Sequence, residues 1–539
     1  MNDVTQVAQL HSRLLTWLAA RTPPGAEPPA RQFARRQGAR LALLYATNAA
    51  TGDPETLLHP VIERKALVGR DPAGTAHERS VLRTLVPDLI PDLAPSPAEH
   101  LDDLLRGFVL AYDAICREAD SFCGELAAGA DIVTRFVARP PNRYRAYLAG
   151  VSDLEPAFDG ADALLDAELR DLAEGDLPVF FTRPGSRAVW TSRGDRLDDV
   201  VPVCGLDSAL ATVRAMGPRD RRRQEWMIEA AFAAGSTTVR HWCLATGSAA
   251  DAGVPDPQRA LDQAEAVARE LGALAHRDGP RVNWLGLEPL ADGRWTVLPS
   301  GLSLGHGYSG IALFLARLGA LTGRSHHLEL AAAALTGAPA RVAALAEQPG
   351  QLAAIGGGFA GLDGVAYALG QLSVLLASPE LRRTADLAAE LAGRREVLGQ
   401  RAATPPGLFE PGLFNDSWCS GVASLAAGGA LDATDRMLWL ARLATTPPLA
   451  DLTVCHGEFG VLEALVILAD GGDDQARATL HRRAARLPDP VASGAAYSGT
   501  PGAVPTPGFL HGLAGVGYGL LRVAFPEKVP SVLTLEPSR

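Results

Sequence analysis

The stretch "DLTVCHGEFG" (451–460) places a thiol, Cys455, beside an imidazole, His456, just before two glycines spaced G-x-x-G. A second stretch, "NDSWCSG", carries Cys419 at the matching place before Gly421. Two thiolates and one imidazole supply three protein ligands for Zn²⁺ and leave a fourth position for water or substrate, which is the pattern of a catalytic zinc site. Small residues packed at tight turns are the alternative that this spacing alone leaves open.

The glycines predict the turns and helices that must position these side chains. From residue 296 onward, five glycine turns each precede an apolar stretch of helical length, and their anchors are Gly307, Gly361, Gly421, Gly457 and Gly512. The intervals between anchors accommodate a turn, an inner helix, a loop and an outer helix, so we expect repeated helical hairpins. Glycine permits tight turns where the helices begin. If the turns gather at one end of a helical barrel, the side chains beside them converge.

Composition excludes several classes of protein. The 539 residues, 47% of them apolar, provide for more than one domain with a large core. A net charge of −11 argues against nucleic-acid binding, which needs a concentrated basic surface. We see no signal peptide and no apolar run near the roughly 18 residues that span a bilayer, and we expect a cytoplasmic protein. Four further cysteines have no ligand-like spacing and are expected to be inert buried thiols: Cys116, Cys123, Cys204 and Cys243.

The motifs resemble those of a known family. "NDSWCSG" followed by "VCHGEFG" resembles the W-C-x-G and C-H-G signatures of lanthionine cyclases, and "GFLHGLAGVGYGLLRV" resembles their last glycine repeat. In the first half, stretches such as "RRQGARLALLYATN", "RFVARPPNRYRAYL" and "LAEGDLPVFFTRPGSRAVW" are similar to class II lanthipeptide synthetases, which join a kinase-like dehydratase to a cyclase. The resemblance implies a mainly α chain from a truncated synthetase. Residues 1–295 would be an α-rich, degenerate dehydratase-like domain, and residues 296–539 an α/α toroid with zinc cyclase activity.

The same resemblance implies a chemistry. Zn²⁺ held by Cys419, Cys455 and His456 would activate a cysteine thiol of a ribosomal precursor peptide for addition to a dehydroalanine or dehydrobutyrine, forming a thioether ring. Such reactions mature peptide natural products, among them lantibiotics. The expected partners are the precursor peptide and a separate dehydratase or synthetase.

The first half departs from the family pattern. The phosphate-binding lysine and the D-x-H-x-x-N loop have no counterpart, so Asp53 would stand alone as a metal-binding aspartate, and we expect neither ATP nor Mg²⁺. The eliminating arginine and threonine fall near Arg135 and Pro141, and proline has no hydroxyl. We therefore expect no dehydratase activity. Arg135 and Arg139 are left either to bind a phosphate or an acidic leader peptide, or to form a solvated helix face.

The cyclase part is reduced as well. Five glycine repeats replace the usual seven, and the two missing ones, between Gly364 and Trp418, include the repeat with a proton-transferring histidine. His306 replaces an aspartate in the first repeat and is the first candidate for acid-base catalysis, with His511 in the last repeat as the second. A local hydrogen-bonding role is the alternative for His306. Ser420 replaces an aromatic residue or histidine beside Cys419. Three functions remain open: a stand-alone cyclase, a non-catalytic scaffold for the precursor or a partner synthetase, and a new reaction at the retained zinc site.

Overall fold

The computed structural model describes residues 4–22, 29–51, 100–139, 141–150, 153–158, 160–234, 256–289, 295–347, 352, 355, 357–397, 416, 418, 421–449, 451–487 and 500–536. The chain is mainly helical, as predicted. It divides into two compact units, Met1–Phe232 and Ala233–Arg539, which are described separately.

The first unit has a helical core. It is built from α1 (Val4–Arg21), α2 (Pro29–Thr51), α5 (Leu101–Arg117), α6 (Ala119–Ala127) and α9 (Gly205–Ala215), while α10 (Pro218–Ala234) runs to the boundary. Phe108, Tyr112 and Phe122 are fully buried in this core. Helices α2 and α5 cross at Gly38 and Gly107, where a side chain on either residue would clash with the facing backbone.

A small sheet completes this unit. Strands β1 (Thr134–Phe136), β2 (Phe180–Thr182), β3 (Val189–Trp190) and β4 (Arg196–Leu197) form an antiparallel meander, accompanied by α7 (Pro141–Leu148) and α8 (Asp162–Ala173). Arg135 is exposed on β1, so the predicted helix face is wrong for this residue. Arg139 is buried and bonds Glu168 at 2.8 Å, which commits its charge to an internal pair instead of a solvated face. Pro141 begins α7, a position where its missing N–H costs nothing.

The second unit confirms the helix starts predicted from the glycines. Each anchor glycine is the N-cap of an inner helix: α12 (Tyr308–Thr322), α16 (Leu362–Leu375), α18 (Val422–Ala427), α20 (Glu458–Asp470) and α22 (Leu513–Ala524). Most residues of α12, α20 and α22 are buried around the whole helix, as expected for helices enclosed by other helices. The inner helices contact one another in the order α16, α12, α22, α20, α18.

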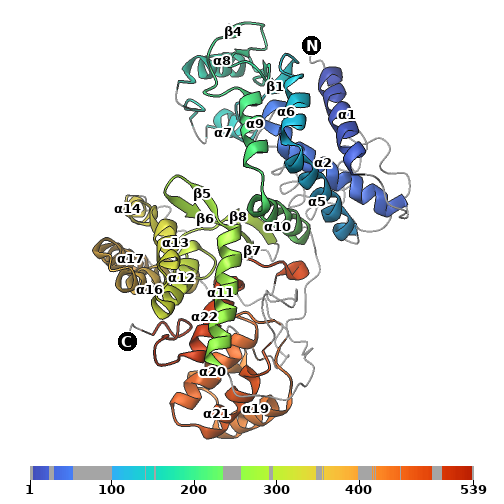
Figure 1. Cartoon of the computed structure of the whole chain (residues 1–539). Helices are drawn as coiled ribbons and strands as arrows, with labels where there is room; N and C mark the ends of the chain where they lie inside the picture. Colours follow the sequence, from blue (N-terminus) through green and yellow to red (C-terminus); the bar gives the residue numbers. More distant parts are fainter. Residues whose placement is uncertain are drawn as a thin grey trace. The chain divides into compact units, whose positions relative to one another are not determined.

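Outer helices cover the inner ones (Figure 1). Helix α13 (Ser325–Leu335) packs on α12, α17 (Pro379–Val397) on α16, and α21 (Asp474–Ala484) on α20. Helix α14 (Ala338–Ala346) contacts α17, and α19 (Ala433–Thr445) contacts α21. Together these contacts form the α/α arrangement of inner and outer helices.

Helix α11 (Pro257–Leu274) is the outer partner of α22, and the two run side by side in Figure 1. The unit therefore closes by pairing a helix near its beginning with the helix near its end. This packing explains why the compact unit begins at Ala233, although the glycine repeats of the sequence begin only near residue 296. The assignment of residues 1–295 to a dehydratase-like domain stays a prediction.

Two β-hairpins follow α11: β5 (His276–Asp278) with β6 (Arg281–Asn283), and β7 (Leu285–Pro289) with β8 (Trp295–Pro299). Short 3₁₀ turns lie at η2 (Gly358–Ala360) and η3 (Pro501–Ala503). In the described part of the chain, one stretch, Ser325–Ala346, is long and apolar enough to cross a membrane by composition alone. It consists of α13 and α14, which pack on other helices of the unit.

Candidate functional site

Three of the glycine turns have the same local structure. The residue after the anchor glycine donates its N–H to the carbonyl seven residues earlier: Tyr308 to Gly301, Glu458 to Asp451 and Leu513 to Thr506, each at 2.8 Å. A side chain on Gly457 or Gly512 would clash with the accepting carbonyl. Glycine is therefore required where the turn folds back against its helix.

Backbone hydrogen bonds connect the five turns in a single series. Gly305 donates to Phe359 at 2.9 Å, and Leu510 donates to Gly305 at 2.8 Å. Cys455 donates to Leu510 at 3.2 Å, and Trp418 donates to Cys455 at 2.9 Å. The turns thus lie next to one another in the same order as their inner helices.

This series places equivalent side chains in register. His306, His511 and His456 each directly precede an anchor glycine, and their rings stack in that order. The ring centroids of His306 and His511 are 5.1 Å apart, and those of His511 and His456 are 5.0 Å apart. This spacing is close to that of neighbouring hydrogen-bonded strands, because backbone hydrogen bonds set the separation in both cases. Trp295 of β8 meets His511 edge-on at 6.3 Å.

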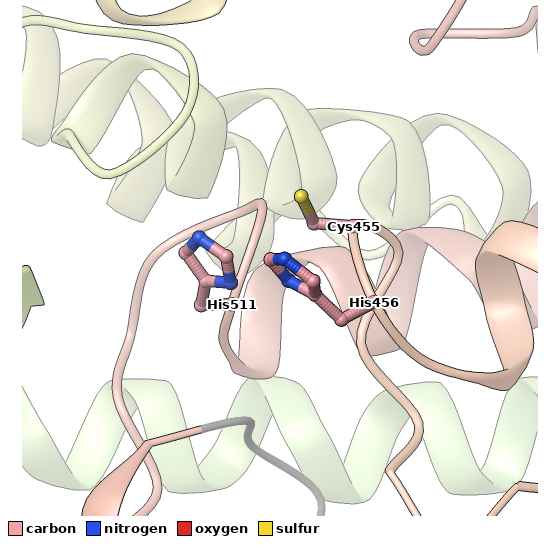
Figure 2. Close-up of side chains that lie close together, drawn as sticks. All are labelled: Cys455, His456 and His511. Atoms are coloured by element: carbon pink, nitrogen blue, oxygen red, sulfur yellow. The ribbon is translucent and has the colours of Figure 1, made fainter. Parts of the chain in front are cut away.

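Cys455 completes the group at one end of this histidine row (Figure 2). The donor atoms of Cys455, His456 and His511 all lie within 4.8 Å of one another. The three side chains are buried, with exposed fractions of 7%, 8% and 9%. Zn–S and Zn–N bonds of about 2.3 and 2.0 Å place tetrahedral donors roughly 3.3 to 3.8 Å apart. Side-chain rotations that move the donor atoms by about 1 Å would therefore bring this set around one ion.

The predicted ligand Cys419 lies outside the described residues, as does Ser420. The described residues before it are anchored at the site. Trp418 bonds the carbonyl of Cys455, and Asp416 accepts hydrogen bonds from Trp439, at 2.8 Å, and from Arg442.

Burial keeps His511 and His306 neutral at neutral pH. Burial lowers the pKa of His511 well below its usual value, and the neighbouring His306 and His456 lower it further. Burial also lowers the pKa of His306 to about 4. In the described part of the chain, Nδ1 of His511 is buried without a hydrogen-bond partner. A buried neutral imidazole with an unused nitrogen beside a thiol is suited to a metal ion, so the residues present fit zinc.

Two residues that hold the Cys455 turn were not predicted from the motifs. Glu458, the first residue of α20, is paired with Arg483 of α21 through two contacts of 2.7 Å, and both side chains are almost completely buried. Glu458 also accepts the N–H of Leu449, and Arg483 donates to the carbonyl of Leu443 at 3.0 Å. The available signal was a glutamate inside the apolar run "EFGVLEALVIL", where a charge requires a partner.

A second cluster has metal-binding residue types but a different environment. Glu265 of α11 lies with His326 and His327 of α13, and their donor atoms are also within 4.8 Å of one another. Its carboxylate already bonds Nε2 of His327 at 2.9 Å and pairs with Arg324 at 3.0 Å. This cluster connects the closing helix α11 to the outer layer.

The remaining thiols differ in exposure. Cys204 is buried and caps α9, while Cys116 and Cys123 are half-buried, and burial raises the pKa of all three thiols. A raised pKa disfavours the reactive thiolate. Of these three thiols, the predicted burial is confirmed for Cys204 and is wrong for Cys116 and Cys123. Cys243 and Asp53 lie outside the described residues.

Comparison with known proteins supports the cyclase resemblance for the second unit. Residues 299–428 and 407–534 match the family described as lanthionine synthetase C-like protein. No curated protein matches the chain. The matched residues contain all five glycine turns, Cys455 and the three stacked histidines.

Proposed function

We propose that the second unit is a lanthionine cyclase that matures a ribosomal peptide. The observation that carries this proposal is the buried group of Cys455, His456 and His511, located where the turns meet in a region similar to lanthionine synthetase C-like proteins. The substrate would be a peptide that contains both cysteine and dehydrated serine or threonine residues.

Zinc would be held by Cys455 and His456 together with Cys419. The hydrogen bond between Trp418 and Cys455 supports including Cys419. When bound, zinc lowers the pKa of a coordinated thiol so that the thiolate is available to attack.

His306 would act as the general base and then the general acid of the addition. Addition to a dehydroamino acid releases one proton from the thiol and consumes one at the carbon next to the carbonyl. A histidine with a pKa near 4 is unprotonated at neutral pH, so it begins as the proton acceptor and returns the same proton at the end. His511 is stacked between His306 and His456 and so lies between the proposed base and the proposed zinc ligand.

The first unit would supply no dehydratase activity. Arg139 is committed to Glu168, and Pro141 offers no hydroxyl. Incubation with ATP, Mg²⁺ and a precursor rich in serine and threonine is expected to give neither phosphorylated nor dehydrated peptide. A separate dehydratase or synthetase would provide the substrate. Loss of one water mass per modified residue would contradict this assignment.

The deciding experiment is ring closure on a peptide that has already been dehydrated. Because thiol addition leaves the mass unchanged, free cysteine should be counted by alkylation before and after incubation. We expect the wild type to protect cysteines and Cys455→Ala to protect none. His306→Asn should slow the reaction by about 10² to 10⁴, the usual size of a general acid-base contribution.

One observation favours a second function. His511 lies close enough to be a fourth protein ligand, which would close the zinc site against thiols and favour a scaffold without catalysis. Replacing His511 with Ala separates the two functions. A scaffold loses zinc affinity and gains thiol access, whereas a cyclase keeps its zinc and loses ring-closing rate.

A further inference from the structure

A separate pocket lies between the β5–β6 hairpin and helices α12, α13 and α14. Its volume is about 300 Å³. Arg277 and Arg281 reach it from the hairpin, Arg341 from α14, and Tyr308 from the start of α12. Its other lining residues include His276, Asn283 and Gly337, and no aspartate or glutamate is among the described ones.

The three arginines of this pocket differ from several arginines of the second unit that pair with acidic residues. Arg483 and Arg522 are buried against glutamates, and Arg324 pairs with Glu265. Within the described part of the chain, the side chains of Arg277, Arg281 and Arg341 have no ion-pair partner. Three cations that have no ion-pair partner among the described side chains surround one cavity, and in a chain with a net charge of −11 they form a local site for an anion.

Tyr308 provides a buried donor in the same pocket. Its side chain is only 4% exposed, and its hydroxyl is buried with no hydrogen-bond partner among the described residues. Burial raises the pKa of this hydroxyl, while the nearby Arg341 and Arg281 act in the opposite direction. An unused buried hydroxyl is costly, and a ligand oxyanion would satisfy it.

We propose that this pocket binds a carboxylate side chain from an acidic segment of the precursor peptide. The guanidinium groups would hold the two carboxylate oxygens, and the hydroxyl of Tyr308 would donate a further hydrogen bond. The volume is at the lower limit of ligand pockets, which suits one side chain and not a nucleotide. Tyr308 is two residues from His306, so a peptide held here would be anchored beside the turn that carries the first histidine of the row.

The proposal rests on the proposed function for the identity of the peptide, but its test needs neither zinc nor ring closure. Fluorescence polarisation with the full chain would compare a labelled peptide rich in aspartate and glutamate with its asparagine and glutamine counterpart. Tyr308→Phe removes only the hydroxyl, and Arg341→Gln removes one exposed charge. Arg382→Gln on α17 is the matched control, because it removes the same charge from an exposed pair with Asp386.

We expect the wild type to prefer the acidic peptide and both pocket variants to bind it about 10- to 100-fold more weakly. The control should bind like the wild type, and Cys455→Ala should bind normally even if it is inactive. Inorganic phosphate is expected to compete. Unchanged affinity in Tyr308→Phe and Arg341→Gln would overturn the proposal. If the acidic peptide and its asparagine and glutamine counterpart bind equally well while inorganic phosphate binds to the pocket, the ligand is an anion other than a peptide carboxylate and the proposal is overturned.

Discussion

Two clusters in the second unit contain the residue types of metal sites, yet they differ in charge balance. The cluster of Cys455, His456 and His511 has a thiol and imidazoles, and the groups that act electrostatically on His511 are other imidazoles. The cluster of Glu265, His326 and His327 has a carboxylate that is already paired with Arg324. A cation bound at the first cluster would meet donor atoms that no cationic side chain already occupies. At the second cluster it would compete with Arg324 for the carboxylate of Glu265. Donor types alone therefore do not identify a metal site, and the neighbouring charges must be considered.

The largest expected effect is on metal content. Cys455→Ala should reduce bound zinc by more than the roughly 10- to 100-fold that changes to outer-shell partners cause, because it removes a ligand. Elemental analysis of the purified protein would measure this, with circular dichroism to verify helix content. Cys204→Ala is the matched control, since both cysteines have an exposed fraction of 7%. Full zinc in Cys455→Ala would remove the distinction between the two clusters.

The next effect concerns the ion pair that supports the Cys455 turn. Arg483→Met should destabilise the protein by about 3 to 5 kcal/mol, because it leaves Glu458 buried without its cation. Adding Glu458→Met should recover most of this loss, apart from about 1 kcal/mol for the hydrogen bond to Leu449. Denaturant unfolding of the single and double variants would test this. A double variant no more stable than Arg483→Met would contradict the charge argument.

The sequence predicted the helix starts well but not how the turns pair. A glycine at an N-cap is a local requirement, and Gly307, Gly457 and Gly512 each begin a helix as expected. The contact between His306 and His511 depends on the first turn lying beside the last, a pairing set by how the unit closes. A local sequence motif does not predict a contact between turns so far apart in the chain.

The same limit explains the boundary between the two units. Helix α11 has the charged texture of the first half, but it belongs to the second unit because it packs along α22. The pair of Glu458 and Arg483 was equally hidden, since the two residues are on different helices. The zinc ligands Cys419, Cys455 and His456 all stay predictions.

A smaller effect is expected at the second cluster. Glu265→Gln keeps the shape of the side chain but removes its charge, which weakens the contacts to His327 and Arg324 and should cost about 2 kcal/mol. Zinc content should remain that of the wild type. Thermal unfolding and elemental analysis on the same sample would test both parts. A lower zinc content would show that this cluster binds metal after all.

The smallest expected effect comes from Glu288 of β7, a carboxylate shifted by burial alone. Burial raises its pKa from 4.5 to about 7, so between these values the folded chain binds a proton that the unfolded chain has released. Its contribution to stability is therefore fully present below pH 4.5 and is lost as the pH rises to about 7. Glu288→Gln should be more stable than the wild type by about 1 to 2 kcal/mol at pH 8, after allowance for partial exposure, and equal to it at pH 4. Unfolding in urea at both pH values would measure the difference. A gain that is the same at pH 4 would assign the effect to packing and not to the charge.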